Sequence, residues 1–318
     1  MMKVEKLCTV ISVCAVLIVL AGCVPSAEMK LDLSQKSETT YKVVTGTSKD
    51  YEFIQPSINK TKERHTGGSV EMVFTQNVES VDPQGNAIAN ITIKGLKYTS
   101  SDAQGKDIGF DSQDEKDKSS PLMKIIGASY KIKISPRGSV EVVDASAARG
   151  IIKTGADEKI AARMLSDEEI ARRHQVMALS DAKGDYKKGD KWSSVVASPP
   201  GMLRSKSFEK VYTLTDIKEE NDQKIATIEM NAVPSSKRAE GAAEKEAGMG
   251  MFANMFDEKD EYNGKMIINL TTGQILSYDE TLKAQWVAAE SSEEQKSDKG
   301  PDQLTMGFTF KYSIEKVD

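Results

Sequence analysis

Few side chains in this 318-residue sequence are of the types that usually carry out chemistry. It has two histidines, His65 in a stretch rich in Lys, Arg and Thr, and His174 on the apolar side of a predicted helix. Two histidines so placed cannot form a zinc site without carboxylates that the pattern does not identify. For His174 we favour a hydrogen-bonded position at the boundary between helix and sheet. The sequence also lacks a Gly-x-Ser-x-Gly elbow, a phosphate-binding loop ending in Lys-Ser/Thr and a His-Glu-x-x-His motif. We therefore expect no catalytic residue, no metal and no enzyme activity; a site assembled from scattered residues is the alternative.

Acidic residues gather in one polar segment, at Asp111, Asp114, Glu115 and Asp117. Carboxylates are calcium ligands, but the spacing lacks the alternate-residue ligands and the central glycine of a calcium loop. A solvated acidic loop is the preferred interpretation. Paired carboxylates for glycoside hydrolysis cannot be selected from 48 acidic residues, and two tryptophans supply few aromatic platforms for sugars.

A cluster of apolar side chains interrupts a second polar insertion. Its members are Met249, Met251, Phe252, Met255 and Phe256. Their spacings of three and four suit one face of a short helix. Methionine-rich surfaces adapt to varied apolar partners, so one interpretation is a mobile lid over a hydrophobic cavity. The other, which we favour, is a short helix that plugs the end of the sheet.

The N-terminus carries the most specific motif. An apolar run, Cys8–Leu20, ends in the tetrapeptide Leu20, Ala21, Gly22 and Cys23. The run has thirteen residues, fewer than the roughly 18 needed to span a bilayer, which argues against a transmembrane anchor or a buried helix. The tetrapeptide resembles the lipobox of bacterial membrane lipoproteins. That resemblance implies a signal peptide at 1–22, cut before Cys23, and acyl chains such as palmitate on Cys23.

The position after this cysteine implies an address. Val24, rather than Asp, follows Cys23, which by resemblance to enterobacterial sorting implies the periplasmic face of the outer membrane. We expect the acylated cysteine and a polar tether at 23–40, followed by one β-rich domain at 41–318 with halves of about 41–180 and 181–318. The covalent lipid on Cys23 is the only non-protein group expected.

Composition places few limits on the rest. Removing 1–22 leaves 296 residues, enough for a large core. All three cysteines precede residue 24, so the mature domain must be stable without disulfides. The net charge of −5 becomes about −6 once Lys3, Glu5 and Lys6 are removed. Because both signs are interspersed, nucleic acid is excluded as a partner.

Alternating hydrophobic residues predict antiparallel strands throughout. We expect a strand, a turn at 46–50 and a second strand near the start of the domain. Hairpins follow around turns at 82–86, 136–138, 219–222 and 271–273, and the last strand alternates strictly from Leu304 to Ile314. Between Asp144 and Ala182 the period changes to about 3.6, and Ser166 with Glu169 forms a capping box for a helix that begins at Asp167.

The predicted fold is mainly β (α+β): a large curved antiparallel sheet or half-barrel with a short helical pair, Ala156–Leu179, across its concave face. Phe74–Ser100 resembles Tyr212–Ser236 in its order of strand, turn and strand, so the two halves are similar and a duplication is one explanation.

Three short motifs carry a family resemblance. They are the hairpin turns Val81–Gly85 and Pro136–Gly138 and the Gly-Asp-x-Trp motif Gly189–Trp192. Together with the lipobox they resemble an uncharacterised, domain-of-unknown-function family of bacterial lipoproteins, which implies no activity. A looser likeness is to lipoprotein-carrier architectures, curved sheets closed by helices over an apolar cavity. We expect a membrane-anchored envelope lipoprotein that binds an apolar ligand or a partner protein; a structural or assembly protein without a ligand is the alternative.

Overall fold

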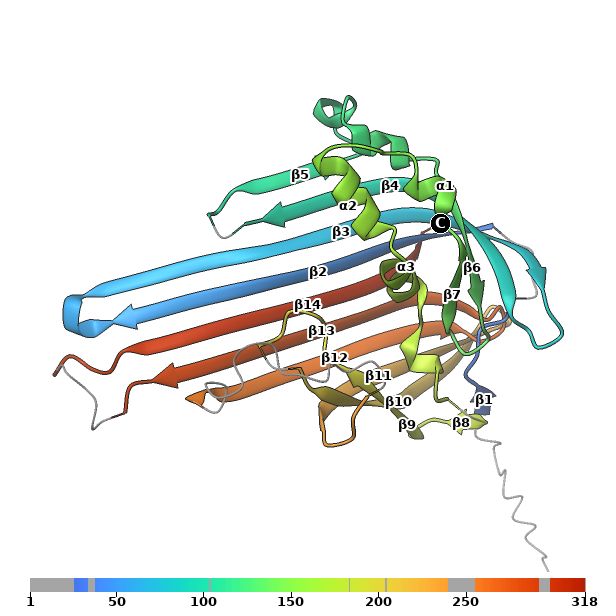
Figure 1. Cartoon of the computed structure of the whole chain (residues 1–318). Helices are drawn as coiled ribbons and strands as arrows, with labels where there is room; N and C mark the ends of the chain where they lie inside the picture. Colours follow the sequence, from blue (N-terminus) through green and yellow to red (C-terminus); the bar gives the residue numbers. More distant parts are fainter. Residues whose placement is uncertain are drawn as a thin grey trace, which may run out of the picture.

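The computed structural model describes residues 26–33, 38–102, 104–182, 184–203, 205–239, 255–291 and 298–317. Its main feature is a curved antiparallel sheet of twelve strands with short helices on one face (Figure 1). The strand order is β7-β6-β4-β3-β2-β14-β13-β12-β11-β10-β9, and β5 pairs with the second half of β4. The sheet is open, because β7 and β9 at its two ends do not pair with each other. This confirms the predicted fold class.

The bounds of the elements are as follows. The strands of the large sheet are β2 (Glu38–Gln55), β3 (Lys60–Val81), β4 (Ala87–Ser101), β5 (Asp107–Asp111), β6 (Ser129–Ile134), β7 (Val140–Asp144), β9 (Lys191–Ala197), β10 (Ser207–Glu220), β11 (Gln223–Ser235), β12 (Asp257–Asn269), β13 (Gln274–Ala289) and β14 (Gln303–Val317). A separate pair consists of β1 (Ser26–Glu28) and β8 (Asp185–Lys187). The helices are α1 (Ser146–Arg149), α2 (Ala156–Met164) and α3 (Asp167–His174), with 3-10 helices η1 (Pro56–Ile58), η2 (Glu115–Asp117), η3 (Pro121–Ile125) and η4 (Met177–Leu179).

The sheet consists of two meanders that meet at its centre. Strands β2 to β7 cross one half and β9 to β14 cross the other, and β14 pairs with β2 over most of its length. All four predicted hairpins at 82–86, 136–138, 219–222 and 271–273 are present. The order β3-β4-β6-β7 in one half matches β10-β11-β12-β13 in the other, and a common origin of the halves stays a prediction.

The first long strand differs from the prediction. We expected a turn at 46–50, but β2 runs without interruption for 18 residues. Gly46 pairs with Ser69 on β3 and Lys311 on β14, and Asp50 pairs with His65 and Gly307. Because long partners on both sides continue their hydrogen-bond ladders through this stretch, they outweigh its local turn propensity. As a result β2 and β3 form an arm that projects beyond the helices (Figure 1).

The segment before β2 also differs from the prediction. We expected a polar tether through residue 40, but Met29, Leu31 and Leu33 are buried in the core. The backbone N–H of Leu31 donates to the carbonyl of Pro136 at 2.9 Å. At Gly273, which has a φ of 62°, a Cβ atom would lie 1.9 Å from the nitrogen of Asp32. The polar composition hid an alternation of apolar residues that packs residues 29–33 onto the domain.

The acidic insertion is held by its own carboxylates. Asp114 caps η2 by accepting from the N–H of Lys116 at 3.1 Å, and Asp117 accepts from the N–H of Asp111 at 2.8 Å. The segment that we expect to be a solvated acidic loop therefore has local hydrogen-bonded structure, and strand β5 ends at its first carboxylate, Asp111.

The helical segment follows the prediction closely. The Ser166 hydroxyl accepts from the N–H of Glu169 at 3.3 Å, and α3 begins at Asp167. The Tyr312 hydroxyl of β14 donates to the carbonyl of Arg173, and the indole N–H of Trp192 on β9 donates to the carbonyl of Ala178. Both of these strands belong to the second half of the sheet, and in the first half Nε2 of His174 lies 2.7 Å from the hydroxyl of Tyr130 on β6. The segment therefore packs on the inner face in both halves of the sheet, as expected. Among the described helices, none is long and apolar enough to cross a membrane.

Candidate functional site

The candidate site is a groove on the inner face of the sheet. Three adjoining cavities form it, of about 470 Å³ beside α2 and α3, about 250 Å³ at the middle and about 550 Å³ toward the projecting arm. The first two share Arg172, Pro200 and Phe310. The third is lined by Gly201, which follows Pro200 in the loop, and by Phe308, which lies two residues before Phe310 on the same face of β14. Cavities of roughly 300–1,000 Å³ are the size that small-molecule ligands occupy.

Strand register decides which side chains reach the groove. Residues directly opposite each other in an antiparallel pair point to the same face. Phe308 pairs with Ala284 and Lys49, and Met306 pairs with Trp286 and Tyr51. On β2, β13 and β14, every second residue points to the inner face of the sheet. In the core these residues pack against the helices, and farther along the arm they form the floor of the groove.

The arm cavity has an apolar floor. Trp286 and Phe308 are each 2% exposed and Met202 is 8% exposed, while Met306 and Leu203 are half-buried. All five line the cavity. Burying comparable side chains stabilises a protein by about 1.5–3 kcal/mol each, and the half-buried ones leave apolar surface that a ligand can cover.

The loop after β9 separates the arm cavity from the middle one. It crosses the floor at Gly201, which has a φ of 103°. A Cβ atom there would lie 3.2 Å from Cε of Lys49 and 3.3 Å from a ring carbon of Phe308. Glycine is therefore required both for the backbone conformation and for the close approach.

The cavity beside the helices is more polar. Lys159 and Arg163 of α2, together with Arg172 of α3, lie along its wall. Opposite them is a stretch of β2 and β3 that includes Gly46, Gly67 and Gly68, where the strands present little side chain. Of these cations, Arg172 is paired with Glu169.

A buried ion pair lies at the middle cavity. Lys210 of β10 and Glu280 of β13 are 4% and 5% exposed, and the ammonium lies 2.7 Å from both carboxylate oxygens. The hydroxyl of Tyr262 donates to Oε2 of Glu280 at 2.7 Å, and that of Tyr278 donates to Oε1. Burial, and then the charge of Glu280, raises the pKa of both tyrosines well above its usual value.

This network limits the chemistry of the middle cavity. Each oxygen of Glu280 already accepts hydrogen bonds from Lys210 and a tyrosine, and the raised pKa keeps both tyrosines protonated. A general base needs an oxygen that can accept a proton from the ligand. The arrangement is typical of a satisfied structural network more than of a catalytic pair.

A second polar cluster adjoins the arm cavity. Lys206 forms ion pairs with Glu258 at 2.9 Å and with Asp260, and Glu258 accepts from the indole N–H of Trp286 at 2.7 Å. Burial raises the pKa of Asp260 above its ordinary value, although Lys206 opposes the shift. The cluster fixes the orientation of Trp286 in the floor of the groove.

His174 lies at the end of the sheet opposite the projecting arm. Its Nε2 is 2.7 Å from the Tyr130 hydroxyl, and its ring contacts Phe74 edge-on at 4.6 Å. Burial, and then the charge of Arg173, lowers the pKa of His174 well below its usual value, so the ring is neutral. The position agrees with the expected helix–sheet boundary.

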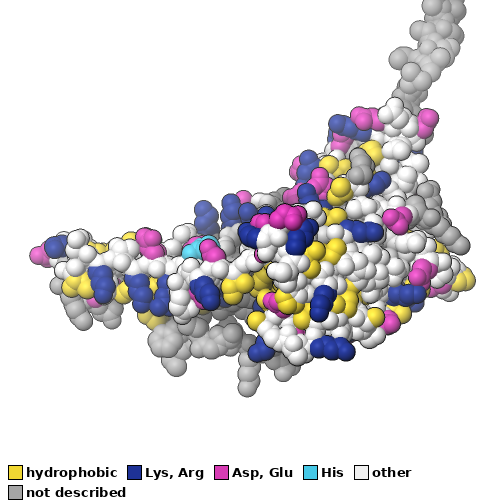
Figure 2. All heavy atoms as spheres, turned by 90° about the horizontal axis from the view of Figure 1, so that it is seen from above, with side chains coloured by type: hydrophobic (Ala, Val, Ile, Leu, Met, Phe, Trp, Pro, Cys, Tyr) yellow, Lys and Arg dark blue, Asp and Glu magenta, His cyan; other side chains and the backbone are white. Residues whose placement is uncertain are grey.

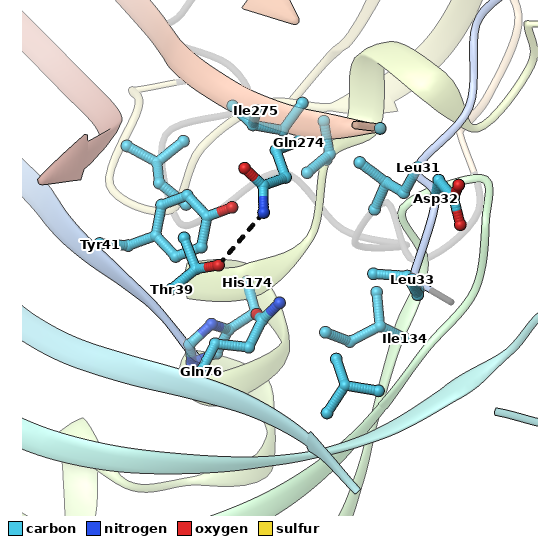
Figure 3. A pocket seen from close by; sticks show the side chains of 14 residues that line it. Leu31, Asp32, Leu33, Thr39, Tyr41, Gln76, Ile134, His174, Gln274 and Ile275 are labelled. Carbon is cyan, nitrogen blue, oxygen red and sulfur yellow. Dashed lines mark hydrogen bonds between the residues drawn. The ribbon is translucent and has the colours of Figure 1, made fainter. Parts of the chain in front are cut away.

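A cavity of about 50 Å³ lies beside His174, and Figure 3 shows the side chains that line it. The amide of Gln274 donates to the Thr39 hydroxyl at 3.3 Å across this space. The volume suits a few water molecules and is too small for an organic ligand.

His65 lies far from His174 in the fold, on the outer face of the arm. Its Nδ1 is 2.6 Å from a carboxylate oxygen of Asp50. The structure does not bring the two histidines together. Among the described residues, no cluster of three or more His, Cys, Asp or Glu side chains could hold a metal ion.

Other predicted site residues lie outside the described residues. They are Leu20, Ala21, Gly22 and Cys23 of the lipobox and Met249, Met251 and Phe252 of the apolar cluster. Of the remaining cluster members, Met255 is 67% exposed and Phe256 packs against the core. The choice between lid and plug therefore stays a prediction.

The groove itself was not predicted residue by residue. Its signals were charged residues at inward positions of alternating strands, namely Lys210 between Phe208 and Tyr212 and Glu280 between Tyr278 and Leu282. A charge at such a position indicates a buried ion pair or a polar cavity.

Taken together, these features define an open, curved-sheet protein with an amphipathic groove on its inner face. Residues 84–275 match DUF6263, a family of unknown function, and the chain belongs to this family. No curated protein matches the sequence.

Two solved structures have a weak likeness to the fold. A DUF1329 family protein from Desulfovibrio piger is 8% identical, with 86% of this chain and 85% of that chain covered, at a TM-score of 0.15. OpdQ from Pseudomonas aeruginosa is 9% identical, with 87% and 97% covered, at a TM-score of 0.16. At these TM-scores neither likeness carries an argument about this chain.

Proposed function

We propose that this protein is a membrane-anchored lipoprotein of the cell envelope that binds an apolar ligand in its inner-face groove without catalysing a reaction. The observation that carries the proposal is the arm cavity of about 550 Å³, whose floor is made by Trp286, Phe308 and Met306. An apolar molecule in this cavity would cover the half-buried side chains of Met306 and Leu203, at roughly 25 cal/mol for each Å² buried.

Two further features support the proposal. The lipobox at Leu20–Cys23 favours an anchor at the membrane, where apolar ligands are abundant. The buried carboxylate of Glu280 is fully hydrogen-bonded, which favours binding over proton-transfer chemistry. Together, the lipobox and the groove favour a protein that takes up an apolar ligand from the membrane surface or releases one to it.

The proposal is tested by making the floor polar without changing its size. We expect the purified full chain to bind N-phenyl-1-naphthylamine, a neutral probe that fluoresces in apolar sites. The double variant Met306→Gln, Leu203→Gln should weaken binding by about ten-fold or more. The bound apolar probe would bury the new amide groups without hydrogen-bond partners, which costs about 1–3 kcal/mol for each unpaired polar group.

The matched control is Thr305→Gln, Thr309→Gln, which places two amides on the opposite face of the same strand. The control should bind the probe as the parent does. Equal affinity for parent and groove variant, or no binding by the parent, would contradict the proposal and favour a structural role without a ligand.

A further inference from the structure

The projecting arm carries its cations on the face that lines the groove. Lys49 and Thr66 are paired across β2 and β3, as are Tyr51 with Arg64 and Phe53 with Lys62. Residues so paired share a face, and Lys49 lies opposite the inward Phe308. Lys49, Lys62 and Arg64 therefore point into the arm cavity, which they line.

The strand register places the acidic side chains of the arm on the other face, although Asp50 is also among the residues that border the cavity. Asp50 pairs with His65 and accepts its hydrogen bond, and Glu52 pairs with Glu63. Successive residues of a strand alternate between faces, so the arm sorts its charges by sign. Figure 2 shows Lys and Arg side chains interleaved with hydrophobic ones along one edge of the projecting arm. An ordinary solvated surface mixes the two signs on each face.

The inward cations also lack partners. Within the described part of the chain, the side chains of Lys49, Lys62 and Arg64 form no ion pair or hydrogen bond. Some other exposed lysines of the sheet form ion pairs, such as Lys42 with Glu315 and Lys131 with Glu79, whereas among the described residues Lys283 and Lys311 on the outer face form none. Lys62 and Arg64, two residues apart on one face, repel each other across roughly 7 Å. An anion placed between them would relieve that repulsion.

The same cavity has an apolar wall facing this cationic one. Trp286, Met306 and Phe308 lie on β13 and β14, across β2 from Lys62 and Arg64 of β3. A ligand that contacts both walls must combine an anionic group with an apolar body. Its charged end would lie at the exposed arm, near Lys62 and Arg64, and its apolar end would lie on the floor beside Gly201.

We infer that the ligand of the groove is an anionic amphiphile, whose phosphate or carboxylate group is bound by Lys49, Lys62 and Arg64. The inference rests on the proposed function and adds the chemical class of the ligand. Neutral amphiphiles bind to the same floor with lower affinity, because they leave the three cations without a counter-charge.

The test compares two competitors that differ only in the head group. Decyl phosphate and 1-decanol are titrated against N-phenyl-1-naphthylamine bound to the full chain, and inorganic phosphate is titrated alone. We expect decyl phosphate to displace the probe about ten-fold more tightly than 1-decanol at low salt, with a smaller ratio at 0.5 M NaCl, where the screening length is only about 4 Å. Inorganic phosphate should not displace the probe.

The variant Lys62→Gln, Arg64→Gln removes two of the inward charges. It should lower the affinity for decyl phosphate most of the way toward that for 1-decanol, since only Lys49 remains, and leave the affinity for 1-decanol unchanged. The matched control is Lys283→Gln, Lys311→Gln, which removes two charges from the outer face of β13 and β14. The control should keep the preference for decyl phosphate, which distinguishes a local contact from an effect of net charge.

The possible failures are distinguishable. If the parent binds the probe but treats decyl phosphate and 1-decanol alike, or if the inward variant keeps the preference, the anionic head group is wrong and the proposed function stands. If inorganic phosphate alone competes as strongly as decyl phosphate, the site takes a free anion and the amphiphile is wrong. If the parent binds neither probe nor competitor, the proposed function itself fails.

Discussion

Glu280 occupies a position on β13 where the strand pattern would place an apolar residue, between Tyr278 and Leu282. The free energy needed to remove a carboxylate and an ammonium from water usually offsets most of their mutual attraction. Here Tyr262 and Tyr278 supply the further hydrogen bonds that make the pair tolerable. The pair therefore contributes little net stability but places a polar group at a defined position in the groove. Removing either partner would leave the charge of the other buried without a counter-charge.

His174 makes the stability of the fold depend on pH. Its pKa is lowered well below 6.5 in the folded protein, so the folded state binds fewer protons than the unfolded state just below that pH. Stability is therefore fully present above the unfolded pKa and is lost as the pH falls below about 6.5 toward the folded pKa. We expect the free energy of unfolding, measured in urea, to fall by up to about 1.4 kcal/mol per pH unit between roughly pH 6.5 and 5.

The exposed histidine provides the control for this effect. His174→Asn should flatten the slope between pH 6.5 and 5, whereas His65→Asn should keep it. A parent protein whose stability is constant across this range, or a His174 variant with the parent's slope, would contradict the buried, neutral histidine of the structure.

At the scale of elements, the sequence predicted those parts whose local signals agree with their packing. The hairpin turns, the last strand and the capping box at Ser166 all formed at the expected residues, because turn chemistry, alternation and capping are local. The turn expected at 46–50 did not form, because two long neighbouring strands decide the conformation of β2. Such pairing is a property of the sheet and is invisible in a window of five residues.

Two other elements depended on partners far along the chain. The packing of residues 29–33 requires the turns at Pro136 and Gly273, which lie more than a hundred residues away in sequence. The cationic wall of the groove requires the register of β2 with β3, which places Lys49, Lys62 and Arg64 on one face. The alternation of Lys62 and Arg64 with Glu63 was present in the sequence, but only the register shows which sign faces inward.

At the scale of the whole molecule, the anchor remains a prediction from the sequence. Changing Cys23 to Ser should abolish labelling of the protein with radioactive palmitate and prevent the mature size from appearing, because acylation needs the thiol that the lipobox presents. The size of the protein on a gel and its palmitate label are measured in the membrane fraction of the cells.

The matched control is Cys14→Ser, which alters another cysteine of the N-terminal segment outside the tetrapeptide. This variant should be labelled and processed like the parent. A Cys23 variant that still takes up palmitate and reaches the membrane at its mature size would refute the lipobox interpretation.

The curved sheet and its helices form the groove, and the central proposal is that this groove holds an apolar ligand. The most direct measurement is the mass of the full chain, extracted from cells and compared under native and denaturing conditions. We expect the native mass to exceed the denatured mass by that of one small molecule, which an organic extract then identifies as an amphiphile. Identical native and denatured masses, with no amphiphile in the extract, would contradict the account.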